Sequence, residues 1–208
     1  VILSKCIYRT TLILEDEKIY TKAQYEAKEY ISKFLSEFPY SSLNPYDEDL
    51  LKDSIDQIQD ILNIKYDDKQ MEAIKTCFNS DLMILTGGPG TGKTTVVRGI
   101  VHIFKQLYPY STICCSAPTG RAPKRLKDLT DTSNSVTIHS LLQWDLESNT
   151  FGKNEEDPLL IDLLIIDEFS MVDYWLFYNL LKASIHIKKI CIIGDEDQLP
   201  SVGPGRLL

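Results

Sequence analysis

Eight consecutive residues, Gly87 to Thr94, have the types and spacing that proteins use to hold a phosphate chain. Their sequence, GGPGTGKT, matches the pattern G-x-x-x-x-G-K-[ST]. Glycines let the backbone approach a phosphate closely, and the N–H groups that open the following helix attract anions. We therefore expect Lys93 to reach the β and γ phosphates of a nucleotide and the Thr94 hydroxyl to ligate Mg²⁺. The alternative is a glycine-rich turn without a ligand. The predicted nucleotide contacts in this segment are Gly88, Pro89, Gly90, Thr91, Gly92, Lys93, Thr94 and Thr95.

An acidic pair, Asp167 and Glu168, follows the apolar run Leu163–Ile166. Ligands bind at the carboxyl ends of strands in open α/β sheets. We expect Asp167 to hold Mg²⁺, directly or through water, and Glu168 to orient and polarise the attacking water. The alternative is that both acids only favour a helix N-terminus. The phosphate loop supports the metal interpretation, because Mg²⁺ must bridge a protein carboxylate and a nucleotide phosphate.

A third apolar run, Ile190–Ile193, is followed by polar residues that include Gln198. An amide both donates and accepts hydrogen bonds, so Gln198 could contact a γ-phosphate. The pattern alone favours the alternative, a strand exit followed by a turn at Pro200.

Apolar strands that alternate with helices are expected to position these residues. A main helix is predicted over Gly92–Tyr108. The predicted strands are Leu82–Thr86, Thr112–Ala117, Leu159–Asp167 (in part) and Lys188–Gly194. Strands that are apolar throughout indicate a parallel sheet covered on both faces. The alternation therefore predicts a three-layer α/β domain.

The first part of the chain has a different pattern. Val1–Tyr20 is rich in β-forming residues, Thr21–Phe38 has helical periodicity, and Pro39–Asp49 breaks it with Ser, Asn, Pro and acidic residues. A second amphipathic helix is expected over Leu50–Leu62. We interpret residues 1–45 as the tail of a preceding, mostly helical domain with its linker, and residues 46–208 as the α/β domain. The chain starts with Val and stops abruptly, so we expect a fragment of a longer protein.

Composition bounds the class of protein. Hydrophobic residues make up 43% and charged residues 25% of the 208, which is typical of a globular protein with a real core. No apolar run reaches the roughly 20 residues that cross a bilayer, so no membrane partner is expected. Five cysteines without a C-x-x-C pair argue against a disulfide framework or a zinc site. Cys114, Cys115 and Cys191 lie in apolar runs, which indicates buried reduced thiols and a cytoplasmic location.

Charge is distributed unevenly. The net charge of −8 argues against indiscriminate binding of nucleic acid. However, the stretch Arg121–Lys127 carries four basic residues and no acidic one. A solvated helix face is the competing interpretation of such a run.

Five segments together resemble the first motor domain of superfamily 1 DNA helicases, and most of all the RecD-like group, related to the α subunit of exodeoxyribonuclease V. They are Gly87–Thr95 (GGPGTGKTT), Ser116–Leu126 (SAPTGRAPKRL), Thr137–Leu141 (TIHSL), Ile165–Asp173 (IIDEFSMVD) and Ile193–Gly203 (IGDEDQLPSVG). The resemblance covers about Tyr66 to Leu208. Many ATPases share the phosphate loop, whereas the APTGRA and GDEDQLPSVG segments are far more specific.

The resemblance implies a RecA-like P-loop fold with a central parallel sheet. It also implies the motor domain of an ATP-dependent 5′–3′ DNA helicase or translocase acting in DNA recombination and repair. ATP, Mg²⁺ and single-stranded DNA would be its ligands, with partner subunits unknown. Lys93, Glu168 and Gln198 would be catalytic, with Gln198 coupling nucleotide state to DNA grip. Gln70 matches the glutamine that reads adenine, although Asp67 and Gln70 also form a D-x-x-Q helix-capping pattern.

The resemblance further implies two DNA-facing segments. Pro118, Thr119, Gly120 and Arg121 match a segment that lies along single-stranded DNA, and hydroxyl or guanidinium contacts with phosphates there would be independent of sequence. Thr137, His139 and Ser140 match the second segment, although a lone His is more often a structural residue.

One departure from the family pattern is Pro123, which stands where these proteins usually carry a small helix former. A proline beyond the first helical turn removes a backbone hydrogen bond, so the start of this helix could shift. The contacts of the neighbouring Lys124 and Arg125 are therefore not fixed by the resemblance.

The aromatic residues Tyr174, Trp175, Phe177 and Tyr178 follow the acidic pair. Bases can stack on such rings, but the helical spacing favours packing into the core.

The resemblance stops before the motifs of a second RecA-like domain, which would supply an arginine worth on the order of 10³–10⁵ in rate. We therefore expect weak or no hydrolysis and no unwinding from this chain alone. The alternatives are a P-loop ATPase of another type, such as an AAA+ protein acting on proteins, and a non-catalytic interaction fragment.

Overall fold

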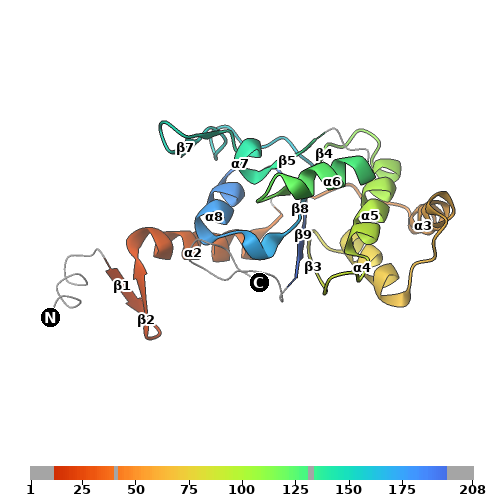
Figure 1. The fold of residues 1–208 in the computed structure, drawn as a ribbon, viewed down its shortest axis with the longest axis horizontal. Helices are drawn as coiled ribbons and strands as arrows, with labels where there is room; N and C mark the ends of the chain where they lie inside the picture. The colour runs from red at the N-terminus through yellow and green to blue at the C-terminus, as the bar shows by residue number, and fades with distance from the viewer. Residues whose placement is uncertain (1–11, 40–41, 131–133, 196–208) are drawn as a thin grey trace.

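The centre of the protein is a five-stranded parallel sheet. A computed structural model describes residues 12–39, 42–130 and 134–195. The strand order is β3-β9-β8-β4-β5 (Figure 1). The bounds are β3 Leu82–Thr86, β4 Ile113–Ala117, β5 Ser135–Thr137, β8 Leu163–Ile166 and β9 Lys189–Gly194. The parallel sheet predicted from the apolar runs is confirmed.

The strand β8, Leu163–Ile166, occupies the middle of the stretch Leu159–Asp167, which was predicted to be strand only in part, so this prediction is confirmed. Leu159, four residues before β8, lies outside the ladder: its N–H donates to the Ala183 carbonyl at 2.8 Å, beside the end of a helix. Leu159 and Ile161 are buried outside the sheet, and periodicity alone does not distinguish such residues from those of a strand.

Helices cover both faces of the sheet. One face packs on α4 (Asp68–Asn79), α5 (Lys93–Leu107) and α6 (Arg121–Thr130), and α3 (Glu48–Leu62) lies outside them, against α5. The other packs on α2 (Lys22–Glu37), α7 (Ile138–Leu141) and α8 (Tyr174–Lys182). Along β8, Ile165 belongs to the first core and Leu164 and Ile166 to the second, as the alternation of a strand requires. The predicted three-layer α/β architecture is therefore confirmed.

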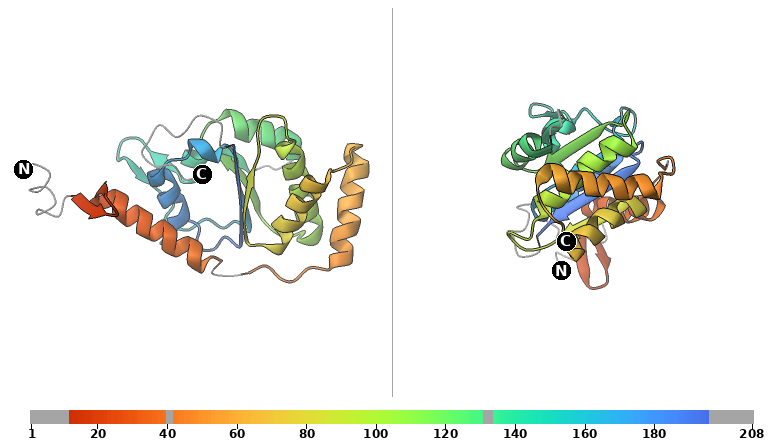
Figure 2. Two further views of the ribbon diagram at one scale, coloured as in Figure 1. Left: turned by 90° about the horizontal axis from the view of Figure 1, so that it is seen from below. Right: turned by 90° about the vertical axis from the view of Figure 1, so that its right-hand side faces the viewer.

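The N-terminal elements pack against this domain. A two-stranded antiparallel hairpin, β1 (Leu12–Glu15) and β2 (Lys18–Thr21), leads into α2, whose start is fixed by a capping box between Thr21 and Gln24. Ile31 and Phe34 of α2 are buried in the core that α8 shares. Figure 2 shows the hairpin at one end of the molecule and α3 at the other. The domain division at residues 45 and 46 stays a prediction.

Smaller elements connect the strand ends. The hairpin β6 (Trp144–Asp145) and β7 (Thr150–Phe151) follows α7, and a short 3-10 helix, η1 (Phe169–Met171), follows the acidic pair.

Cys114, Cys115 and Cys191 are buried free thiols, as expected. In the part of the chain that the structure describes, no helix is both long and apolar enough to span a bilayer.

Candidate nucleotide-binding site

The loop between β3 and α5 has the backbone of a phosphate cradle. Gly90 and Gly92 have φ values of 78° and 82°, in the region that favours glycine. Gly92 is the N-cap of α5, so Lys93 begins the helix and its N-terminal N–H groups face the loop. A Cβ on Gly92 would also displace the side-chain amide of Gln70, in addition to the strain that its positive φ imposes on other residues.

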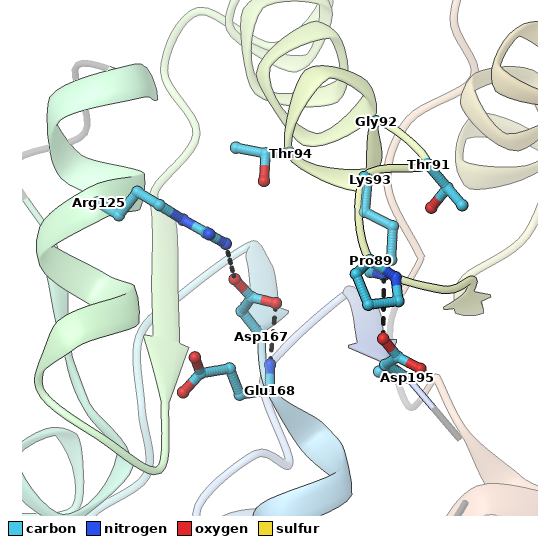
Figure 3. Close-up of a pocket in the computed structure, with 11 residues that line it drawn as sticks. Pro89, Thr91, Gly92, Lys93, Thr94, Arg125, Asp167, Glu168 and Asp195 are labelled. Atoms are coloured by element: carbon cyan, nitrogen blue, oxygen red, sulfur yellow. Dashed lines mark hydrogen bonds and ion pairs between the residues drawn. The ribbon is translucent and has the colours of Figure 1, made fainter. Parts of the chain in front are cut away.

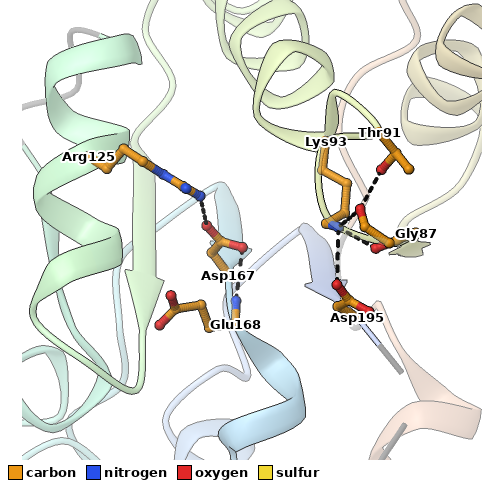
Figure 4. Close-up of polar contacts among 8 residues, drawn as sticks. Gly87, Thr91, Lys93, Arg125, Asp167, Glu168 and Asp195 are labelled. Carbon is orange, nitrogen blue, oxygen red and sulfur yellow. Dashed lines mark hydrogen bonds and ion pairs between the residues drawn. The ribbon is translucent and has the colours of Figure 1, made fainter. Parts of the chain in front are cut away.

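The Lys93 ammonium group lies inside this loop. It donates to the Gly87 carbonyl and, at 2.9 Å, to the Gly88 carbonyl. It also lies 3.8 Å from Asp195 Oδ2, at the end of β9 (Figure 4). Asp195 is buried. A lysine held by carbonyls and a carboxylate is a positioned cation, ready for a phosphate to take over its contacts.

Asp167 and Glu168 lie at the carboxyl end of β8, as predicted. The Asp167 N–H donates to the Ser116 carbonyl of β4 at 2.8 Å, which extends the ladder and fixes the position of the carboxylate. Asp167 Oδ1 accepts from the Glu168 N–H at 2.9 Å, and Oδ2 lies 3.4 Å from Arg125 Nη2. Burial raises the pKa of the Asp167 carboxyl, while the Glu168 N–H and the Arg125 guanidinium oppose that rise.

Glu168 has a left-handed backbone with φ of 54°, uncommon for a residue with a side chain. It precedes η1 but makes no capping hydrogen bond with its side chain. Instead, Glu168 Oε2 accepts from the Thr119 hydroxyl at 2.7 Å. The alternative that the acidic pair only caps a helix is therefore not supported, and this strained residue lies where functional residues often lie.

One cleft brings the two motifs together. A cavity of about 420 Å³ is enclosed by the loop, the acidic pair and the end of β9 (Figure 3). Its lining residues are Pro89, Gly90, Thr91, Gly92, Lys93, Thr94, Arg125, Asp167, Glu168, Gly194 and Asp195. Gly88 and Thr95, also predicted to contact nucleotide, are not among them. Gln198 lies outside the described residues.

The oxygens in this cleft suit Mg²⁺. Mg²⁺ prefers oxygen ligands and usually takes few from the protein, with phosphate and water supplying the rest. The Thr94 hydroxyl and the Asp167 carboxylate line the same cavity. No cluster of three or more His, Cys, Asp or Glu side chains suited to a metal occurs among the described residues. The donor set therefore fits a metal that enters together with a phosphate chain.

Gln70 lies beside the loop and has two local partners. Its Oε1 accepts from the Asp67 N–H at 3.2 Å, which completes the capping box of α4, and its Nε2 donates to the Thr91 carbonyl at 3.4 Å. The capping interpretation of this pair is thus confirmed. A second cavity of about 380 Å³, lined by Gln70, Leu85 and Val96 among others, adjoins the loop. Contact with adenine stays a prediction.

The two predicted DNA-facing segments meet at one edge of the sheet. Pro118, Thr119 and Gly120 connect β4 to α6, and β5 pairs with β4 so that Thr137 lies opposite Ala117. Thr137 caps α7 by accepting from the Ser140 N–H at 3.2 Å.

The basic side of this edge is formed by α6. The helix starts at Arg121, which is exposed. Pro123 is thus the third helical residue, where a missing N–H removes no intrahelical bond.

His139 has structural neighbours. Its ring centroid lies 6.1 Å from those of both Trp144 and Phe151. Those two rings also pack on Trp175, at 5.4 and 4.8 Å. The core interpretation of the aromatic run is confirmed for Phe177, which is buried, whereas Trp175 is 44% exposed at the edge of this cluster. His139 as a DNA contact stays a prediction.

Two residues of the site were missed by the sequence patterns, Arg125 and Asp195. Arg125 was noted only as part of a basic run, and Asp195 only as one of several acids after β9. A signal existed for Asp195, because it is the first polar residue after an apolar strand, the same signal that singled out Asp167.

Comparisons with known proteins agree with these motifs. The model of a family described as "AAA domain" matches residues 70–204. The RecBCD enzyme subunit RecD of Buchnera aphidicola is 30% identical over 217 residues, with 96% of this chain and 35% of that protein covered. The ATP-dependent RecD2 DNA helicase of Deinococcus radiodurans is 40% identical over 124 residues, with 60% and 17% covered.

A solved structure supports the fold. The Pif1 helicase from Candida albicans superposes with a TM-score of 0.53 at 24% identity, covering 67% of this chain and 34% of that one. The chain thus spans about a third or less of each of these proteins, and the resemblance to the RecD-like group is confirmed for that part.

Proposed function

This chain belongs to the AAA domain family, and from that premise we propose that it is the nucleotide-binding motor domain of an ATP-dependent DNA helicase. The observation that carries the proposal is the single cleft shared by Lys93, Thr94 and the acidic pair. A cation, a hydroxyl and two carboxylates around one cavity suit a metal-bound triphosphate more than any uncharged ligand.

In the proposed reaction the phosphates lie along residues 87–92, where backbone N–H groups and Lys93 compensate their charge. The Thr94 hydroxyl and the Asp167 carboxylate would hold Mg²⁺, which would supply positive charge to the phosphate oxygens. Glu168 accepts a proton from the attacking water, whose oxygen bonds the γ-phosphorus as the bond to the bridging oxygen breaks. The hydrogen bond from Thr119 occupies only Oε2 of Glu168, which supports a role for Oε1 in this step.

Gln70 and Gln198 complete the proposed nucleotide contacts. The cavity beside Gln70 adjoins the loop and has a volume of about 380 Å³, which supports placing the base there. Gln198 follows β9 in the sequence, and its side-chain amide would contact the γ-phosphate. This contact would make the affinity for DNA depend on which nucleotide is bound.

Single-stranded DNA is the proposed polymer substrate. Pro118, Thr119, Gly120 and Arg121 would contact the strand, together with Thr137 and His139 from the neighbouring segment. Their common position at one edge of the sheet, beside the exposed basic side chains of α6, supports a path for a phosphate backbone. The hydrogen bond from the Thr119 hydroxyl to Glu168 Oε2 supports coupling between DNA binding on that path and ATP hydrolysis.

The proposal for the longer protein goes further. The resemblance to the α subunit of exodeoxyribonuclease V supports a 5′–3′ helicase or translocase in DNA recombination and repair. The name of one relative, a subunit of an enzyme, supports the presence of partner subunits. Buried free thiols at Cys77, Cys114, Cys115 and Cys191 support a reducing cytoplasmic location.

The test is binding of single-stranded DNA by this chain. A labelled oligothymidine is titrated at several salt concentrations, and fluorescence anisotropy gives the affinity. We expect tighter binding to the single strand than to a duplex, and Arg121→Ala should lower the salt slope by about one. Lys52→Gln, an exposed charge loss on α3, serves as the control. Absence of binding at low salt, or an Arg121→Ala slope equal to that of the control, would refute the DNA part of the proposal.

A further inference from the structure

Arg125 links α6 to the metal-facing carboxylate. Its Nη2 lies 3.4 Å from Asp167 Oδ2, and the two side chains are 58% and 11% exposed. Figure 4 shows the guanidinium crossing from α6 to the end of β8. Asp167 Oδ1 accepts from the Glu168 N–H, and Oδ2 is the oxygen that Arg125 contacts.

The cleft therefore contains two ion pairs, each made of one basic and one acidic side chain. Lys93 lies 3.8 Å from Asp195, and Arg125 lies 3.4 Å from Asp167. Lys93 is held in addition by two loop carbonyls, whereas Asp167 is the polar partner of Arg125 among the residues that the structure describes. Arg125 is thus the cation of the cleft whose long, largely exposed side chain can leave its partner with the smallest loss of contacts.

We propose that Arg125 is a resident counter-ion of Asp167 that competes with the divalent cation for this carboxylate. This rests on the proposed nucleotide site. Mg²⁺ binds oxygen at about 2.0–2.1 Å, and a guanidinium within hydrogen-bonding range of the same oxygen would repel it. A metal ion that ligates Oδ2 directly therefore excludes the guanidinium from this oxygen. A displaced guanidinium remains in the cleft, where its planar fork suits the oxygens of a phosphate.

Arg125 is accordingly a positioning residue with two alternative partners, the Asp167 carboxylate and the phosphates of the nucleotide. Without metal it keeps the buried Asp167 carboxylate paired. With metal and nucleotide its charge becomes available to the phosphates. Because Arg125 lies one turn into α6, one turn after Arg121, the exchange of partners also connects the metal site to the helix that carries the basic run.

The test measures how nucleotide binding depends on Mg²⁺. A fluorescent, non-hydrolysable ATP analogue is titrated into the chain at a series of Mg²⁺ concentrations, which gives the Mg²⁺ concentration for half-maximal binding. We expect Arg125→Gln to lower that concentration by about two- to fivefold, the size set by a partly exposed ion pair. Arg125→Lys, which keeps a positive charge, should stay closer to the wild type, and Lys52→Gln should match it.

The same measurement in an Asp167→Asn protein separates competition at Asp167 from a general effect of the Arg125 charge on the cleft. With Asp167→Asn in place, adding Arg125→Gln should produce no further change in the Mg²⁺ dependence, because the shared carboxylate is gone. An unchanged or raised Mg²⁺ requirement in Arg125→Gln overturns the proposal, as does an effect of equal size in the Asp167→Asn background. Absence of analogue binding by the wild type at every Mg²⁺ concentration would instead overturn the nucleotide site itself.

Discussion

The Thr119 hydroxyl donates a hydrogen bond of 2.7 Å to Glu168 Oε2. The two residues follow neighbouring strands, because β4 and β8 pair in parallel with Ser116 opposite Ile166. The left-handed backbone at Glu168 accompanies this contact. The bond therefore ties the loop that we propose to face DNA to the carboxylate that we propose to activate water.

Removing this hydroxyl should have a measurable cost in stability. Thr119→Val keeps the shape of the side chain but leaves a partly buried carboxylate oxygen without its donor, so we expect the free energy of unfolding to fall by about 1 kcal/mol. Thr119→Ser retains the hydroxyl and should lose less. Urea denaturation of the three proteins makes the comparison, and equal stability of the Val and wild-type proteins would show that the bond does not stabilise the fold.

The glycines of the phosphate loop provide a graded series. Gly92→Ala combines a φ of 82° with displacement of the Gln70 amide from its hydrogen bonds, whereas Gly90→Ala has only the unfavourable φ of 78°. A Cβ on Gly88 meets no atom within 4 Å. We expect losses of unfolding free energy in the order Gly92, Gly90, Gly88, with about 1 kcal/mol or more for each strained position and little for Gly88. Thermal unfolding tests the order, and a Gly88→Ala protein as unstable as Gly92→Ala would contradict it.

Gln70 and Asp67 allow capping to be separated from base recognition. Both side chains form the capping box of α4, so Gln70→Ala and Asp67→Ala should each lower stability by about 1 kcal/mol. If Gln70 also contacts adenine, Gln70→Ala should reduce the preference for ATP over GTP, while Asp67→Ala should leave it intact. Competition binding with the two nucleotides measures this preference. A preference that survives Gln70→Ala restricts Gln70 to its structural role.

The chain has two tryptophans, and both belong to the cluster around Phe151. The Phe151 ring lies 4.6 Å from Trp144 and 4.8 Å from Trp175. Phe151→Ala should therefore shift the intrinsic fluorescence to the red and cost about 2 kcal/mol, less than a fully buried Phe. Leu146→Ala, on the same hairpin and 84% exposed, is the control. Unchanged fluorescence in Phe151→Ala would mean that the hairpin does not pack as described.

Sequence patterns predicted the parts of the site that depend on local order. The loop before α5 and the acids after β8 follow from strand-to-helix junctions, which neighbouring residues specify. The contacts of Lys93 with Asp195 and of Thr119 with Glu168 depend instead on which strands are adjacent. Periodicity within one sequence does not encode strand order, so these pairs became visible only in the folded chain.

Short elements escaped prediction for a related reason. The strand β5 has three residues, and β6 and β7 have two each, too few for an alternation to be recognised. The helix bounds were predicted well because caps mark them: Thr21 and Phe38 flank α2, and Gly92 and Tyr108 flank α5.

The central claim is that one metal-bound nucleotide lies between Lys93 and Asp167. A crystal structure of this chain with Mg²⁺ and a non-hydrolysable ATP analogue tests it most directly. We predict a triphosphate within hydrogen-bonding distance of the Lys93 ammonium group, and a metal ligated by the Thr94 hydroxyl and facing Asp167. An analogue bound elsewhere, or this cleft found empty at saturating concentration, would contradict the claim.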